Sequence, residues 1–344
     1  MSESAVVLWE GSGTRGGSRT STRWASYPRR VSAESGADDR AHSFVVAASE
    51  AGVRIDVLLA ARLGVGRAAA RALLESGAVR IDERRLGPRH KGVCVSGGSR
   101  VEVIGFAPPR AQRARPQQEL PLVVLTRGRG WLAVDKPPGQ PVHPLRPEEG
   151  GTLLNALVAR HPELHGVGEG GLRSGVVHRL DVDTSGVLLF ATEAAAWERL
   201  RGAFRAHRVD KLYRAIVVGH MEGEGAADVE LAVVRHRPAR VAVVARARTR
   251  RSRLAGLRWR AIAHGPSATL LEVRPRTGFL HQIRATLAHL GHPVCGDPIY
   301  GEASGVPRQM LHAARLAVDE VLAESPDPPD FAAACARLLG SPPW

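Results

Sequence analysis

Two acidic side chains, Asp181 and Asp183, lie two residues apart in a polar stretch between two apolar segments of residues 174–191. The apolar segments have the composition of strands, and a polar turn between rigid strands is a common position for catalytic side chains. Paired carboxylates could act as acid and base in a glycosidase-like reaction, or bind a divalent metal ion. Alternatively, Asp183 only builds the turn through hydrogen bonds to the backbone, with Gly186 supplying an unusual φ. These residues alone leave the alternatives open.

A basic residue that could serve a carboxylate is Arg284, in the stretch Thr277–Arg284. Gly278 precedes a predicted helix whose apolar side faces away from Arg284, and Arg284 lies in line with His281. Arginine is always charged and can bind a carboxylate with two parallel hydrogen bonds, so a residue placed here could reach a buried acid. The stretch by itself favours the alternative, an ordinary surface arginine.

The elements that would position both stretches lie within residues 122–335, which we expect to form the larger of two domains. Apolar and β-branched runs predict strands at Leu122–Leu125, Trp131–Val134, Val187–Ala191, Leu212–Val218, Val241–Ala245 and Leu270–Val273. Helical spacing of apolar residues predicts helices at Leu153–Arg160, Glu193–Arg205 and His281–Leu290. Because helices do not separate the strands regularly, we predict an α+β fold with a mixed, mostly antiparallel sheet.

Four further segments flank this domain. Residues 1–43 are rich in Ser, Gly and Arg without an amphipathic period, which predicts a disordered tail. Residues 44–106 indicate a small α/β module, in which Arg67 and Arg71 share one helix face. Residues 107–121 are rich in proline and arginine and predict an extended basic linker. Residues 336–344 are expected to end the last helix as a C-terminal extension.

The 344 residues carry a formal net charge of +14, and 44% of them are hydrophobic. The hydrophobic content excludes wholesale disorder, and the charge indicates a polyanionic partner, with nucleic acid as the first candidate. Residues 231–271 contain ten arginines and no acidic residue. The alternation of Arg246, Arg248 and Arg250 would place three of them on one face of a strand, as a ridge that follows RNA phosphates. The alternative is a disordered basic loop.

Metal and membrane functions find little support in the sequence. The three cysteines lack CxxC spacing, which argues against a disulfide framework and a structural zinc site and fits a cytoplasmic location. The pairs His161 with His165 and His289 with His292 have no evident third ligand. No apolar run reaches about 18 residues, so we expect no membrane span.

Several motifs together resemble one enzyme family. His178-Arg-Leu-Asp181 followed by Asp183-Thr-Ser-Gly186 resembles the signature of the RluA-type pseudouridine synthases. Further similar blocks follow the family's order, at Trp131–Gly139, Val209–Ala215, Thr277–Arg284 with Gly291–Gly301, and Arg308–Ala313. The resemblance spans about residues 122–331 and implies the pseudouridine synthase fold. Residues 53–104 are similar to an S4-type RNA-binding domain, which many members of the family carry.

The resemblance implies roles for individual residues. Asp181 would be the essential aspartate that attacks or deprotonates the sugar, so that uracil leaves C1′ and rejoins through C5. Arg284 would be the basic partner that keeps this aspartate ionised, and Tyr213 would stack on the flipped base. Arg179 would help to flip the nucleotide. Asp183 would have no catalytic role and would only build the turn. We expect RNA contacts from Arg179, His178, Arg67, Arg71, Lys136, Arg248 and Arg250, and no cofactor or metal.

These observations favour an RNA uridine isomerase, with large-subunit ribosomal RNA as the first candidate substrate and transfer RNA as the second. We expect a monomer. The alternatives are an RNA-binding or ribosome assembly factor without catalysis, and a metal-dependent nuclease that uses Asp181 and Asp183. Phe279 and Leu280 depart from the family pattern, in which a basic and a small polar residue are usual. The resemblance therefore predicts the catalytic residues more firmly than the contacts with the substrate.

Overall fold

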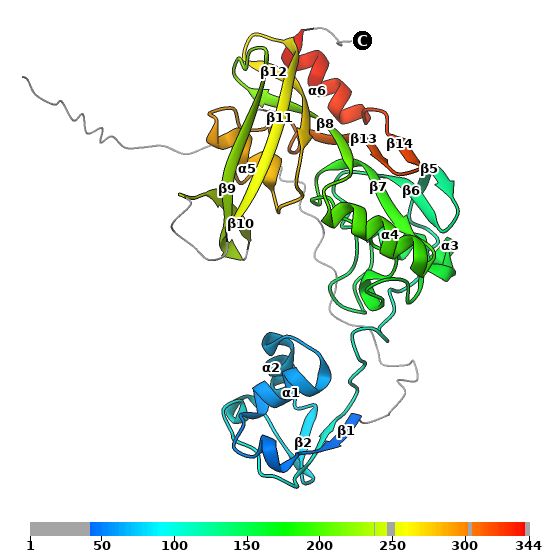
Figure 1. Cartoon of the computed structure of the whole chain (residues 1–344), viewed down its shortest axis with the longest axis vertical. Helices are drawn as coiled ribbons and strands as arrows, with labels where there is room; N and C mark the ends of the chain where they lie inside the picture. Colours follow the sequence, from blue (N-terminus) through cyan, green and yellow to red (C-terminus); the bar gives the residue numbers. More distant parts are fainter. Residues whose placement is uncertain (1–41, 237, 246–251, 302–304, 341–344) are drawn as a thin grey trace, which may run out of the picture.

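The computed structural model describes residues 42–236, 238–245, 252–301 and 305–340 (Figure 1). Within these residues a four-stranded sheet has the order β1-β4-β2-β3, and a ten-stranded sheet has the order β10-β9-β11-β12-β8-β13-β7-β6-β5, with β14 paired to β13. In the larger sheet β13 pairs with β7 in parallel, and the other recorded strand pairs are antiparallel. The predicted α+β fold is confirmed for this sheet. No helix in the described ranges has the length and apolar character needed to cross a membrane.

The larger sheet contains every strand that we predicted, together with four more. The predicted strands correspond to β5 (Val123–Gly128), β6 (Trp131–Lys136), β7 (Ser185–Ala191), β8 (Asp210–Val218), β10 (Ala239–Val243) and β12 (Ala268–Pro275). The additional strands are β9 (Glu224–His236), β11 (Arg253–His264), β13 (Leu311–Val318), which begins within the block Arg308–Ala313, and β14 (Val321–Glu324).

Strands β6 and β7 are buried on both faces, which explains their continuous apolar sequences. Alternate residues of each strand belong to two different core clusters, because successive side chains point to opposite faces. Helix α4 (Ala194–Arg205) packs on one face through Trp197 and Leu200, as its periodicity predicts. Helix α3 (Leu153–Arg160) packs on the other face, and its first turn is capped by Thr152.

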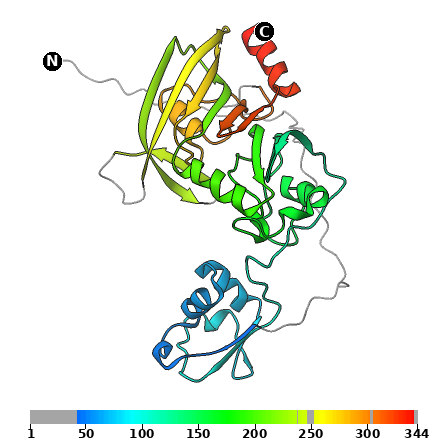
Figure 2. The same cartoon turned by 45° about the vertical axis from the view of Figure 1, so that its right-hand side comes forward.

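The other half of the sheet is covered in the same way by two helices (Figure 2). Helix α5 (Gln282–His289) shares a core cluster with Ala215 and Val217 of β8. Helix α6 (Pro329–Leu339) shares a different cluster with Ile216, the residue between them. Strand β8 therefore connects α5 on one face with α6 on the other, and it places its first half near the polar turn that precedes β7.

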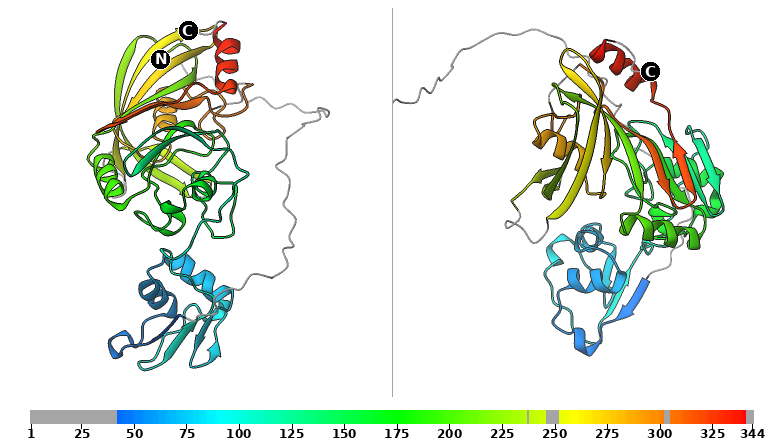
Figure 3. Two further views of the ribbon diagram at one scale, coloured as in Figure 1. Left: turned by 90° about the vertical axis from the view of Figure 1, so that its right-hand side faces the viewer. Right: turned by 45° about the horizontal axis from the view of Figure 1, so that its top comes forward.

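Residues 42–106 form a smaller unit of their own (Figure 3). Helices α1 (Ile55–Leu63) and α2 (Arg67–Glu75) pack on the sheet of β1 (His42–Val45), β2 (Val79–Ile81), β3 (Arg84–Arg85) and β4 (Arg100–Val103). Its core cluster is built from residues of this segment. Strand β1 begins inside the predicted tail, and residues 1–41 of that tail lie outside the described residues.

The prediction that residues 107–121 form an extended tether is wrong for the second half of this segment, which is docked on the larger domain. Ala114 is 1% exposed and belongs to the core cluster of α3. The Asn155 side chain donates to the carbonyl oxygen of Arg115, and Arg160 donates to those of Gln118 and Leu120. A segment with little apolar content is thus held through its backbone, which composition does not reveal.

The predicted end of the larger domain is also shifted. Helix α6 continues through Leu339 and ends where Gly340 adopts a left-handed conformation, whereas we expected the domain to end at residue 335. The last helical residues therefore belong to the domain, and residues 341–344 lie outside the described residues.

Gly186 offers a test of the junction between β7 and β13. Its φ is +110°, and a Cβ atom at this position would meet the carbonyl oxygen of Ala313 in the neighbouring strand. We predict that Gly186→Ala lowers the free energy of unfolding by at least roughly 1–3 kcal/mol, measured by urea denaturation. Gly202→Ala is the control, because Gly202 lies within α4 with nothing near its Cβ position, and it should raise stability by about 0.5–1 kcal/mol. Equal stability of Gly186→Ala and the native chain would contradict this interpretation.

Candidate active site

The polar turn between the two apolar segments begins at Asp181 and leads directly into β7. The amide of Thr184 donates to the carbonyl oxygen of Asp181 at 3.1 Å, which closes the turn over Val182 and Asp183. Arg308 donates to the carbonyl oxygen of Asp183 at 2.9 Å, and Gln309 donates to the Thr184 hydroxyl at 2.9 Å. The turn that carries Asp181 is therefore held from the segment that precedes β13.

Lys136 holds the same turn from the end of β6. Its Nζ donates to the carbonyl oxygens of Pro137, Gln140 and Val182 at 2.7–2.8 Å, and the side chain is 0% exposed. Burial lowers the pKa of Lys136 to about 7, while the three acceptors use all three protons of the ammonium form. The prediction that Lys136 contacts RNA is therefore wrong, because its donors are consumed inside the protein.

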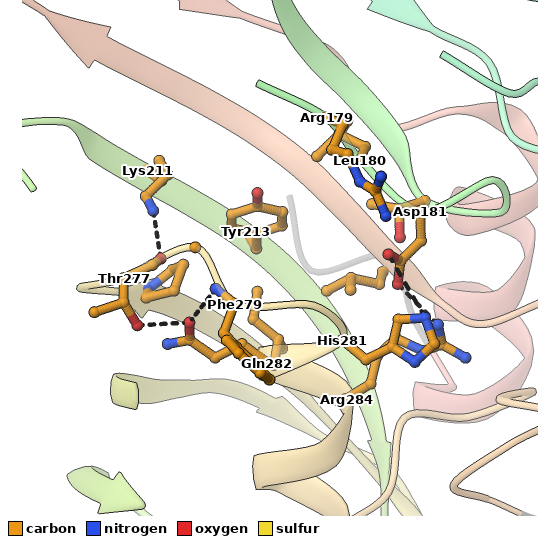
Figure 4. Close-up of a pocket in the computed structure, with 15 residues that line it drawn as sticks. Arg179, Leu180, Asp181, Lys211, Tyr213, Thr277, Phe279, His281, Gln282 and Arg284 are labelled. Atoms are coloured by element: carbon orange, nitrogen blue, oxygen red, sulfur yellow. Dashed lines mark hydrogen bonds and ion pairs between the residues drawn. The ribbon is translucent and has the colours of Figure 1, made fainter. Parts of the chain in front are cut away.

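Arg284 joins two carboxylates. Its Nη1 donates to Asp181 Oδ2 at 2.8 Å, while Nε and Nη2 donate to the two oxygens of Asp297 at 2.6 and 2.8 Å. Arg284 and Asp297 are 3% and 1% exposed, whereas the Asp181 side chain is 23% exposed. The surface alternative for Arg284 is thus wrong. Asp297 orients the guanidinium from behind, and Asp181 is the member that faces the cavity (Figure 4).

The charges of this triad support one another. Burial opposes the charged form of Asp297, but the hydrogen bonds and charge of Arg284 outweigh it and hold the pKa of Asp297 below its ordinary value of 3.8. Burial likewise opposes the charge of Arg284, and the two carboxylates raise its pKa above the ordinary value. The stabilisation from Asp297 is thus present above pH 3.8 and is lost as the pH falls below it.

A cavity of about 100 Å³ lies between Asp181 and the first half of β8. Tyr213 and Lys211 of β8 line one side, and Phe279 and Arg284 line another (Figure 4). Burial, with the charge of Asp181, raises the pKa of Tyr213, so the phenol stays protonated at neutral pH. A flat aromatic residue and a carboxylate thus line the same cavity.

His281 lines the cavity, although its place in the sequence predicted only the start of a helix. It is the N-cap of α5 and has a left-handed φ of 51°. Its Nδ1 is 3.0 Å from the Tyr300 hydroxyl, which accepts a hydrogen bond from the amide of Val241, and its Nε2 is 4.0 Å from Asp181 Oδ1. The signal available in the sequence was its place three residues before Arg284, on the same helix face.

The structure separates the other predicted RNA-binding residues. Arg179 is exposed and lines the cavity next to Asp181. His178 accepts a hydrogen bond from the Leu189 amide and stacks on Phe204, and burial lowers its pKa to about 3. The imidazole of His178 is therefore neutral and half-buried with its Nε2 occupied, and its contact with RNA stays a prediction.

In the smaller unit, Arg67 and Arg71 both bind the buried carboxylate of Asp56, and each keeps about half of its side chain exposed. Arg54 binds the same carboxylate at 3.1 Å. Three arginines thus share one acid at the surface of this unit, which leaves a local excess of positive charge. Arg248 and Arg250 lie outside the described residues.

Comparison with known proteins places this geometry in a family. A family model described as RNA pseudouridylate synthase matches residues 130–289. Ribosomal large subunit pseudouridine synthase D of Nitrosomonas europaea is 33% identical over 309 residues, which cover 85% of this chain and 86% of that protein. The chain belongs to the RNA pseudouridylate synthase family. It is therefore an isomerase that acts on uridines in RNA.

Two further comparisons agree. Ribosomal large subunit pseudouridine synthase D of Xanthomonas campestris is 36% identical over 296 residues, which cover 81% of this chain and 85% of the relative. The solved structure of human RNA pseudouridylate synthase domain containing 1 superimposes with a TM-score of 0.52 at 28% identity, covering 64% of this chain and 89% of the human chain. The predicted RluA-like family is thus confirmed, whereas the S4-type resemblance of residues 53–104 stays a prediction.

The triad predicts different stability effects for its two acids. Asp297→Asn should lower the free energy of unfolding by roughly 3–5 kcal/mol, because it leaves the buried Arg284 charge without its main partner. Asp181→Asn should change it by less than about 1 kcal/mol, because Asp181 is more exposed and Arg284 keeps Asp297. Urea unfolding at neutral pH measures both. Equal losses for the two variants would show that Asp297 does not anchor the arginine.

Proposed function

We propose that this enzyme converts uridines of large-subunit ribosomal RNA to pseudouridine, with Asp181 as the catalytic carboxylate. The relatives from Nitrosomonas europaea and Xanthomonas campestris carry that substrate in their names. The observation that carries the proposal is the ion pair of Asp181 with the buried Arg284 at the edge of a cavity that also contains Tyr213. Transfer RNA is the alternative substrate.

In the proposed reaction the bond between N1 of uracil and C1′ of ribose breaks, and a bond between C5 and C1′ forms. Asp181 either attacks the sugar or removes a proton from it, and Arg284 keeps the carboxylate oriented toward the sugar. Tyr213 stacks on the uracil while the base turns. The C5 proton is lost and N1 gains a proton, so the composition of the RNA does not change. Arg179 at the rim assists in flipping the nucleotide, which costs a few kcal/mol.

The residues around Asp181 and Tyr213 support these assignments. Asp183 has its carbonyl oxygen bound to Arg308 and belongs to the turn, so we assign it a structural role. The cavity places Phe279 and Thr277 beside Tyr213, and Lys211 donates to the carbonyl oxygen of Thr277 on the same side. Catalysis proceeds from this chain's own side chains. The free thiols of Cys94, Cys295 and Cys335 fit a reducing compartment, and we propose a cytoplasmic location.

The paired acids in one turn allow a matched test of catalysis. We predict that Asp181→Asn lowers the rate of tritium release from ribosomal RNA labelled at C5 of uridine by about 10²–10⁴-fold or more, with unchanged RNA affinity. Asp183→Asn, two residues away, should retain most of the activity. Similar losses in both variants would contradict the assignment of Asp181. The same assay on transfer RNA transcripts distinguishes the two substrates, and inactivity of the native chain on both would favour a non-catalytic binding role.

We further propose that residues 44–106 form an S4-like RNA-binding domain that precedes the catalytic domain. The separate core cluster of the small unit supports this division. Its RNA-binding surface would be the arginine group around Asp56, because the carboxylate orients Arg67 and Arg71 while part of each guanidinium stays exposed. Phosphate oxygens would take the remaining donors.

Salt dependence tests this surface. Binding that neutralises six to ten phosphates should weaken by about 10³–10⁵ between 50 and 200 mM salt. Replacing both Arg67 and Arg71 by alanine should reduce the slope of log affinity against log salt by about 1.4–1.8, measured by fluorescence anisotropy with a ribosomal RNA fragment. Arg62→Ala is the control, because Arg62 binds Glu50 with two hydrogen bonds. An unchanged slope in the double variant would exclude this surface from RNA binding.

A further inference from the structure

Three side chains that can bind metals meet at the end of the sheet beyond the active site. His220 and Glu222 lie in the connection between β8 and β9, and His264 is the last residue of β11. One ligand atom of each lies within 4.8 Å of the other two. Tyr213 and the end of β8 at Val218 are five residues apart, roughly 17 Å along a strand, so this group lies well away from the proposed catalytic residues.

The hydrogen bonds of His264 determine which of its nitrogens is available. Its Nδ1 is 3.3 Å from the Thr269 hydroxyl, and that hydroxyl donates its single proton to the carbonyl oxygen of Gly219 at 2.8 Å. The contact therefore has His264 Nδ1 as the donor. In the neutral ring Nε2 then carries the lone pair, and Nε2 is the nitrogen that lies 3.6 Å from Glu222 Oε2.

His220 is oriented by a similar contact. Its Nε2 is 3.2 Å from the carbonyl oxygen of Pro266, which can only accept a hydrogen bond, so Nε2 is the donor and Nδ1 carries the lone pair. The two imidazole rings are nearly parallel, at 10°, with centroids 6.0 Å apart. Histidines that bind metals commonly donate their second nitrogen to a hydroxyl or carbonyl oxygen in this way.

His264 Nε2 and Glu222 Oε2 thus face each other at 3.6 Å, which is longer than a hydrogen bond. We propose that His220, Glu222 and His264 bind one zinc ion, with water in the remaining position. Two imidazole nitrogens and one carboxylate oxygen are a common zinc ligand set. Ligand atoms on one tetrahedral zinc lie about 3.3–3.5 Å apart, so these three must approach by about 1 Å. All three side chains are exposed and can move by this amount.

The ion would act as a structural clip. It joins the connection after β8 to the turn between β11 and β12, next to the end of α6 at the top of Figure 1, where the Cβ position of Gly265 adjoins Leu338. The three ligands come from two segments separated by more than 40 residues, so the ion ties together parts of the sheet that are distant in sequence. Zinc should therefore raise the unfolding temperature without changing pseudouridine formation.

The test is calorimetric titration of ZnCl₂ into the full chain after removal of metals with a chelator, at pH 7.5. We expect one zinc per chain, and a loss of affinity of more than about 100-fold in both His264→Ala and Glu222→Gln. His161→Ala is the matched control, because His161 contacts Glu163 at 3.1 Å but belongs to no group of three ligands in the described part of the chain. It should bind zinc as the native chain does.

A second pair of variants separates the zinc site from general folding effects. Thr269→Val removes the acceptor for His264 Nδ1 and should weaken zinc binding about 10–100-fold, while Thr269→Ser keeps the hydroxyl and should restore it. Visible absorption of bound Co²⁺ reports tetrahedral coordination independently of stability. No binding by the native chain, or equal binding by the native chain and His264→Ala, would overturn the proposal and leave His264 and Glu222 as a surface ion pair.

Discussion

The site depends on one buried guanidinium. Arg284 is almost inaccessible to water, and a charge in that position is costly unless opposite charges surround it. Asp297 satisfies two of its donors from inside the protein, which leaves the remaining bond to hold Asp181 at the edge of the cavity. The buried pair of Arg284 and Asp297 thereby positions the partly exposed carboxylate of Asp181. These hydrogen bonds form only when α5, the loop after it and the turn before β7 pack together.

Side chains from other parts of the chain hold the turn that carries Asp181. Lys136 from β6 binds the carbonyl oxygen of Val182, and Arg308 from the segment before β13 binds that of Asp183. Arg308 also binds Asp330 at the start of α6 with two hydrogen bonds, so the last helix supports the turn as well. A short loop between strands is thus fixed by cations from three parts of the chain, which is how a reactive carboxylate can stay in place without regular secondary structure around it.

Helices α3, α4 and α5 and the strands with apolar runs were found close to their predicted ends, because period and composition report burial directly. Strands β9 and β11 were not predicted, since their charged residues hide the alternation along an exposed part of the sheet. The docking of residues 114–120 was missed as well, because it rests on side chains of α3 that bind carbonyl oxygens and not on apolar residues of the segment.

The sequence by itself determined the family, the residues Asp181, Tyr213 and Arg284 as candidates, and the need for a turn at Asp183 and Gly186, because these depend on residue type and local spacing. Only the tertiary structure decided which acid supports Arg284, since Asp297 is 13 residues away along the chain and its partners are set by how the loop after α5 folds back. Burial decided the rest. Lys136 has the residue type of an RNA-binding side chain, but its ammonium group already donates to three carbonyl oxygens and has nothing left to offer a phosphate.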